Sequence, residues 1–97
     1  MNSAELAEKF GNELKDFVAE WIKDHAKEIT DCKEEHSDRA VIMGGLSGVL
    51  GYMAASFALN EGWTKGQLLE FVEIAKRFVE ATAEGSFDER KREQVEG

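Results

Sequence analysis

Charged and apolar residues are interspersed along most of this chain, but a segment of twenty residues from Ala40 to Leu59 has no charged side chain. With successive residues placed about 100° apart, as in an α-helix, the segment has two different faces. The small face consists of Ala40, Gly44, Ser47, Gly48, Gly51, Ala54, Ala55 and Ala58. The bulky face consists of Ile42, Met43, Leu46, Val49, Leu50, Met53 and Phe57. Because both faces are apolar, the pattern predicts a helix over residues 38–60 that is covered on all sides.

The residues before this segment predict a first helix from Asn2 or Ser3 to about His36. The Asn2 side chain can cap the amino end, and Glu5 stands at the third position of a capping box. Gly11 is expected to kink or break the helix, because glycine in a helix interior costs up to about 1 kcal/mol relative to alanine. One apolar stripe has coiled-coil-like steps of three and four residues, and we expect it to pack on the bulky face: Leu14, Val18, Trp21, Ile22, His25, Ile29, Cys32 and His36.

Both ends of the central helix have residues that commonly terminate helices. Ser37 or Asp38 can cap the amino end, and Gly62 can adopt the left-handed conformation that follows a carboxyl end. A third helix is predicted to begin directly afterwards, because Thr64 and Gln67 form a T-x-x-Q capping box.

The third helix has its own apolar face. Trp63, just before the cap, can pack on Leu68 as a hydrophobic staple. The apolar face comprises Leu68, Phe71, Val72, Ala75, Phe78, Val79 and Thr82. Gly85 is expected to end this helix. Residues 86–97 are mostly charged, which predicts either a mobile tail or a frayed helix that docks through Phe87.

Composition and length favour an all-α homodimer. The chain has 97 residues and no proline, and no alternating β-branched run indicates a strand. We therefore expect a single helical domain, a three-helix unit over residues 1–85. Such a unit is small for covering every side of a central helix by itself. The small face is therefore expected to meet the same face of a second copy in a two-fold dimer.

A membrane span over residues 40–59 is the alternative use of the uncharged segment, because about 20 apolar residues are needed to cross a bilayer. The segment contains four glycines, two serines and a tyrosine, which weaken insertion. Its flanks also lack a clear excess of positive charge. A soluble, cytoplasmic protein is the expectation, and a single cysteine suits a reducing compartment.

The charge is strongly acidic, with 12 Lys and Arg against 20 Asp and Glu and a formal net charge of −8. This argues against direct nucleic-acid binding of the ordinary basic kind. The first predicted helix has an acidic stripe that includes Glu20, Asp24, Glu28, Asp31, Glu35 and Asp38. We expect this stripe to bind a basic protein, as a small bacterial or phage inhibitor that imitates nucleic-acid charge would. The alternative is a solvated face, partly relieved by Lys23 and Lys27.

Three residues of the first helix suggest a transition metal: His25, Cys32 and His36. On a helix, His25 and Cys32 would lie about 10.5 Å apart, which is too far to share one ion. Cys32 and His36, one turn apart, could share an ion but would need further ligands from elsewhere. The alternative is a buried cysteine and two hydrogen-bonded histidines. We expect no metal or cofactor, and a bundle that binds metal through Cys32 and His36 remains an alternative.

No arrangement of residues indicates an enzyme. The sequence Gly44-Gly45-x-x-Gly48 lacks the preceding strand that a phosphate-binding loop requires. No Ser-His-Asp set, Cys-His pair or cofactor motif has a supporting context. We therefore expect a non-catalytic protein that acts through protein–protein contacts.

Overall fold

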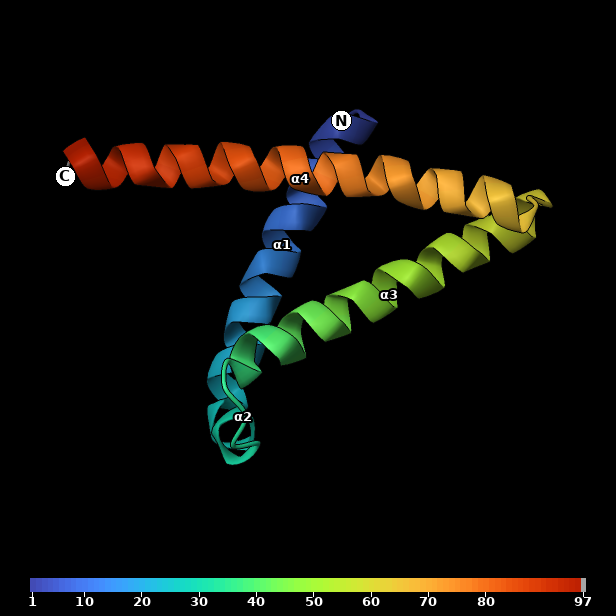
Figure 1. Ribbon diagram of the computed structural model, residues 1–97. Helices are drawn as coiled ribbons and strands as arrows, with labels where there is room; N and C mark the ends of the chain where they lie inside the picture. The colour runs from blue at the N-terminus through green and yellow to red at the C-terminus, as the bar shows by residue number, and fades with distance from the viewer. Residues whose placement is uncertain (97) are drawn as a thin grey trace. The chain divides into compact units, whose positions relative to one another are not determined.

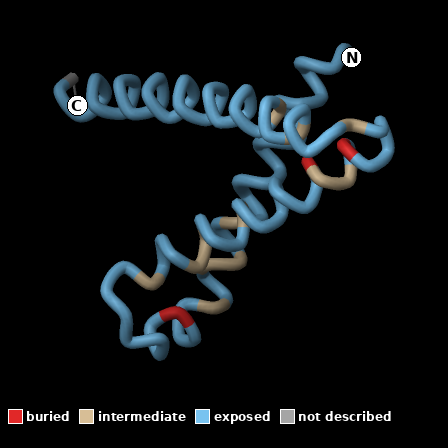
Figure 2. Tube along the Cα trace, turned by 45° about the vertical axis from the view of Figure 1, so that its right-hand side comes forward, coloured by how far each residue is buried: buried red, intermediate tan, exposed pale blue. Residues whose placement is uncertain are grey.

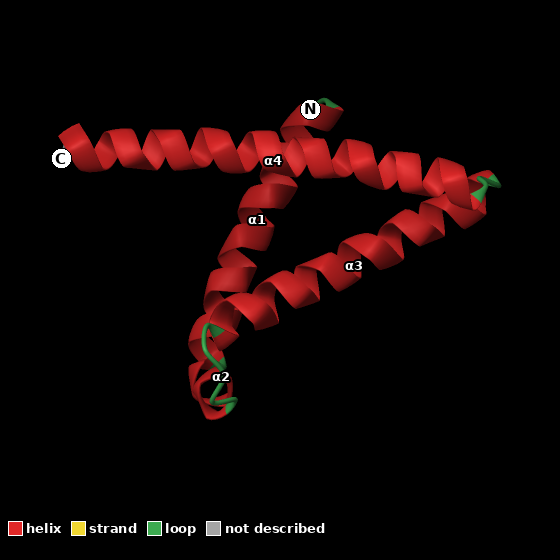
Figure 3. Cartoon of the chain, viewed as in Figure 1, coloured by secondary structure: helices red, strands yellow, loops and turns green. Residues whose placement is uncertain are grey.

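A computed structural model of the chain describes residues 1–96, with side chains as far as Val95. These residues form four helices and no strand: α1 (Ser3–Asp24), α2 (Ala26–Asp31), α3 (Ser37–Glu61) and α4 (Lys65–Glu96) (Figure 1). Short connecting segments join them (Figure 3). The all-α prediction is confirmed. The chain divides inside α3 into two compact units, Met1–Gly48 and Val49–Gly97.

In the first unit, α1 begins where the sequence predicts. The Oδ1 atom of Asn2 accepts a hydrogen bond from the backbone N–H of Glu5 at 2.9 Å, which confirms the predicted cap. The helix then continues through Gly11, so the predicted break there is wrong. A single glycine costs only about 1 kcal/mol, and helical residues on both sides of Gly11 offset that cost.

The prediction of one long first helix is also wrong, because the helix ends at Asp24 and α2 begins after His25. His25 leaves helical geometry, with φ −114° and ψ 17°. Its ring Nδ1 lies 2.8 Å from the carbonyl oxygen of Trp21, and the two rings stack with centroids 4.1 Å apart. A side chain bonded to the last turn of a helix favours a local turn over continued helix.

A turn with two left-handed residues separates α2 from α3. Lys33 and His36 have φ values of 57° and 58°, so the helix cannot continue to His36. The Ser37 hydroxyl donates a hydrogen bond to the carbonyl oxygen of Ile29 at 3.0 Å, and Ile29 is buried. The predicted caps, Ser37 and Asp38, both lie inside the first turn of α3, so that prediction is wrong.

In the second unit, the carboxyl end of α3 matches the prediction closely. Gly62 is left-handed, with φ +69°. The N–H of Trp63 bonds to the carbonyl of Ala58 at 2.8 Å, and the N–H of Gly62 bonds to the carbonyl of Leu59 at 3.4 Å. These two bonds form a Schellman motif, which satisfies carbonyl groups that a helix end would otherwise leave unpaired.

The amino end of α4 confirms the predicted capping box. The N–H of Thr64 donates to Oε1 of Gln67 at 2.8 Å, and the N–H of Gln67 donates to Oγ1 of Thr64 at 3.2 Å. The Phe71 ring contacts Trp63 at 5.3 Å and the α3 residue Phe57 edge-on at 6.2 Å, measured between centroids. The turn is therefore fixed by both backbone caps and aromatic packing.

Helix α4 is longer than predicted, because it passes through Gly85 and continues to Glu96. Gly85 has no left-handed φ, so it does not end the helix. Residues 86–96 of the predicted tail are thus helical, and Gly97 lies outside the described residues. Phe87 is 64% exposed, so the predicted docking through its ring is not found.

Few side chains are buried, as Figure 2 shows. The buried hydrophobic residues in the described part of the chain are Ile29, Ala54 and Ala58. Helix α3 forms over nearly the predicted span, but its bulky face stays largely open: Leu50 is 62% exposed and Met43 is 58% exposed.

Candidate functional site: the exposed central helix

Helix α3 is a long apolar helix whose surface is largely exposed. Among the described residues it alone is long and apolar enough to cross a membrane, judged by length and composition. A core helix of a soluble protein passes the same test, but it is mostly buried. In α3, only 6% of the most apolar 18-residue stretch is buried. Large apolar patches on soluble proteins usually mark contact sites, which makes α3 a candidate contact surface.

The eight residues of the small face have different environments. Ala54 and Ala58 are buried within the chain itself, and Ala55 is half-buried. The others, Ala40, Gly44, Ser47, Gly48 and Gly51, are exposed. A Cβ atom added at Gly44, Gly48 or Gly51 would meet nothing within 4 Å. The packing of the chain itself therefore does not explain why these helix positions are glycine.

The bulky face is open along most of its length. Met53 is 43% exposed and Phe57 is 44% exposed, in addition to Leu50 and Met43. Ile42 and Leu46 are half-buried. Of these side chains, Met43 is open in the first unit, and Leu50, Met53 and Phe57 are open in the second.

The structure does not place the predicted acidic stripe on one helix. Of the six carboxylates, Glu20 and Asp24 lie on α1, Glu28 and Asp31 on α2, Glu35 in the turn and Asp38 in the first turn of α3. The breaks at His25 and at the left-handed residues interrupt the helical register on which the stripe was predicted. All six carboxylates are exposed. The one ion pair among the described side chains joins Glu35 to His36, at 3.4 Å.

The candidate metal ligands Cys32 and His36 do not lie on one helix. Cys32 and His36 were paired because a helical turn would separate them, but α2 ends at Asp31. Cys32 is exposed, not buried as the sequence pattern indicated, and its thiol donates to the carbonyl of Glu28 at 3.4 Å. In the described part of the chain, no three His, Cys, Asp or Glu side chains are arranged to hold a metal ion.

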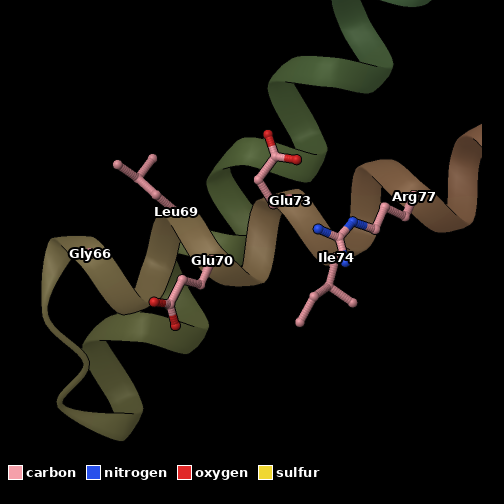
Figure 4. Close-up of a pocket in the computed structure, with 6 residues that line it drawn as sticks. All are labelled: Gly66, Leu69, Glu70, Glu73, Ile74 and Arg77. Atoms are coloured by element: carbon pink, nitrogen blue, oxygen red, sulfur yellow. The ribbon is translucent and has the colours of Figure 1, made fainter.

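A shallow depression on α4 is a further candidate for a ligand site (Figure 4). Its lining residues all belong to this one helix: Gly66, Leu69, Glu70, Glu73, Ile74 and Arg77. In Figure 4, Leu69 and Glu73 point away from Glu70 and Ile74. Ligand sites are concave and have convergent polar groups, and in this shallow depression the polar groups do not converge.

Sequence reasoning missed part of the apolar face of α1. Because the helix continues through Gly11, three further large residues, two before Gly11 and one after it, lie on the same stripe as Leu14 and Trp21. These are Leu6, Phe10 and Phe17, which are 52%, 67% and 63% exposed. Their spacing of four, four, three and four residues from Leu6 to Trp21 was the available signal.

Comparison of the chain with models of protein families, with curated proteins and with solved structures finds no match in any of the three.

Proposed function

We propose that this protein is non-catalytic, self-associates through α3 and acts by binding a basic partner. The observation that carries the proposal is the exposure of the uncharged segment of α3 from Ala40 to Leu59: Leu50 is 62%, Tyr52 73% and Leu59 84% exposed. Fully burying one leucine-sized side chain contributes about 1.5–3 kcal/mol. Covering several such side chains therefore provides a large driving force for association.

A second copy is the simplest partner for α3. A two-fold contact uses the same surface on both chains, so one exposed helix supplies both halves of the interface. The small face predicted from the sequence is one candidate surface. Its Ala54 and Ala58 end is already covered within the chain, however, which leaves the stretch from Ala40 to Gly51 open there.

The mass of the untagged protein in detergent-free buffer, measured by light scattering, tests self-association. We expect a dimer or a small discrete oligomer. Leu50→Glu should shift the protein to monomer, because it places a charge in the middle of α3. Leu69→Glu on α4 is the matched control, since Leu69 is 56% exposed, and it should leave the mass unchanged. A monomeric wild-type protein would contradict the proposal.

The exposed carboxylates between Glu20 and Asp38 support the second part of the proposal, binding of a basic protein. None of them is paired with Lys or Arg among the described side chains, so their charge is available to a partner. At 0.1 M salt, the attraction between exposed charges is largely screened beyond about 10 Å. Binding should therefore weaken steeply as salt is added.

Titration with a lysine-rich peptide tests this surface. The first variant changes Asp24, Glu28, Asp31 and Glu35 to lysine, and the matched control makes the same change at Glu70, Glu73, Glu80 and Glu84 on α4. Both variants alter the net charge equally. We expect only the first to lose affinity. Equal losses would show that net charge alone attracts the peptide and would remove the carboxylates at 24–35 as a site.

A single membrane span is a second candidate function, favoured by the low burial of α3. The uncharged residues from Ala40 to Leu59 extend about 30 Å as a helix, which equals the hydrocarbon thickness of a bilayer. This candidate predicts that the protein sediments with membranes and resists extraction by alkaline carbonate. The preferred proposal predicts that it stays in the supernatant without detergent.

A further inference from the structure

One face of α3 is nearly symmetric about its middle residue. With residues about 100° apart, Arg39, Met43, Leu46, Leu50, Phe57 and Glu61 all fall within about 60° of the helix circumference. Met43 and Phe57 are equally distant from Leu50 in sequence, and so are Arg39 and Glu61. The face thus has Leu50 at its centre, Met43 and Leu46 on one side of it, Phe57 on the other, and opposite charges at its two ends.

This face is largely open in the structure, and of its residues only Leu46 is half-buried. Leu50 is 62% exposed, Met43 58% and Phe57 44%. Arg39 and Glu61 are also exposed, and neither forms an ion pair with another described side chain. The Phe57 ring touches Phe71 only edge-on, which leaves nearly half of its side chain accessible to a second molecule.

We propose that α3 pairs antiparallel with α3 of a second copy through this face, with the two-fold axis at Leu50. The pairing rests on the self-association proposed above and specifies its surface and direction. In this register the two Leu50 side chains meet, and Met43 of each chain packs beside Phe57 of the other. Large apolar side chains then fill the interface, as in antiparallel helix packing generally.

The charges select the antiparallel direction. With the axis at Leu50, Arg39 of each copy faces Glu61 of the other, so both ends of the interface have an attractive pair. A parallel pair would place Arg39 beside Arg39 and Glu61 beside Glu61. Exposed ion pairs add little affinity, but like charges placed together disfavour the wrong arrangement. The small face has no comparable pair of charges, and its Ala54 and Ala58 end is already buried.

Cysteine cross-linking tests the register in a Cys32→Ser background, which removes the one native cysteine. Leu50→Cys should form a disulfide-linked dimer on oxidation, because the axis brings the two positions together. Met43→Cys should not link to itself. Each Met43 lies about 10.5 Å along the helix from the axis, so the two positions are about 21 Å apart, and a disulfide needs Cα atoms within about 7 Å. A mixture of Met43→Cys and Phe57→Cys chains should form the mixed dimer.

A charge exchange tests the direction without relying on disulfide geometry. Arg39→Glu alone and Glu61→Arg alone should each weaken the dimer about tenfold, because two attractive pairs become repulsive. The double variant Arg39→Glu/Glu61→Arg should regain wild-type affinity to within about threefold. Dissociation constants from sedimentation equilibrium provide the readout, and circular dichroism checks that each variant keeps its helices.

The possible results separate this inference from the proposal on which it rests. A monomeric wild type removes self-association altogether. A wild-type dimer with efficient self-linking of Met43→Cys would show a parallel pair, and self-linking of Gly48→Cys in place of Leu50→Cys would move the contact to the small face. Either of these last results, or a double charge variant that stays as weak as the single ones, overturns the antiparallel pairing at Leu50.

Discussion

The turn between α3 and α4 predicts that the same substitution has opposite effects at two glycines. Gly62 has φ +69°, in the left-handed region, whereas Gly85 lies inside the regular helix α4. A Cβ added at either position would meet nothing within 4 Å, so steric contact does not distinguish the two. Backbone conformation alone decides the sign of the effect.

The magnitudes follow from the backbone. Holding alanine in the left-handed region costs about 1–2 kcal/mol, so Gly62→Ala should lower the free energy of unfolding by about that amount. In a helix interior, alanine is favoured over glycine by about 0.5–1 kcal/mol. Gly85→Ala should therefore raise the free energy of unfolding. For a domain of this size, 1 kcal/mol corresponds to about 4–8 °C in Tm.

Thermal unfolding followed by circular dichroism at 222 nm measures both shifts. All samples need the same protein concentration, because self-association stabilises the folded state by mass action. Gly11→Ala in α1 is a second control and should behave like Gly85→Ala, since it is also helical with open space around its Cβ. An unchanged or raised Tm for Gly62→Ala would refute the left-handed geometry of the turn.

Three further substitutions test individual contacts. Thr64→Ala removes the acceptor for the Gln67 N–H and should cost about 1 kcal/mol of stability, measured by urea unfolding. Phe71→Ala removes the ring that packs on Trp63 and Phe57, and because Phe71 is only half-buried the cost should be about 2 kcal/mol, below the 3–5 of a fully buried phenylalanine. In a Trp21→Phe background, where Trp63 is the one tryptophan left, Phe71→Ala should also shift the fluorescence maximum of Trp63 to the red. An unshifted maximum would argue against the packing of Phe71 on Trp63. Ser37→Ala removes the bond to the Ile29 carbonyl and should cost about 1 kcal/mol. A Tm equal to wild type would show that water replaces that bond at no cost.

The helix ends that depend on hydrogen bonds between neighbouring residues were predicted correctly from the sequence. The Asn2 cap, the left-handed Gly62 and the Thr64–Gln67 capping box all rest on hydrogen bonds between residues at most a few positions apart. Such bonds form in the same way in almost any fold. They are therefore visible in one sequence, and the structure contains each of them.

The errors arose where helical periodicity was extended past a side chain that interrupts it. The apolar stripe from Leu14 to His36 reads as one helix, but the stacking of His25 on Trp21 and the left-handed Lys33 divide it. The prediction at Gly85 has the opposite error, because a glycine there predicts a helix end although the helix continues. Pattern alone does not reveal whether a given glycine or histidine ends a helix.

The candidate site shows the same limit. The two faces of α3 follow directly from the sequence, and so does the helix itself, within one residue at each end. Which face is covered depends on contacts between distant residues. Ala54 and Ala58 are buried while Leu50 stays exposed, and helical periodicity contains no information on that choice.

The division of the chain inside α3 gives each unit one tryptophan, Trp21 in the first and Trp63 in the second. The two units share helix α3, so unfolding of either unit leaves the other with a frayed end of α3. Local openings in proteins often involve such contiguous segments. The fluorescence of Trp63→Phe chains would thus report unfolding of the first unit, and that of Trp21→Phe chains unfolding of the second. Coincident melting curves would mean that the two units unfold cooperatively through α3.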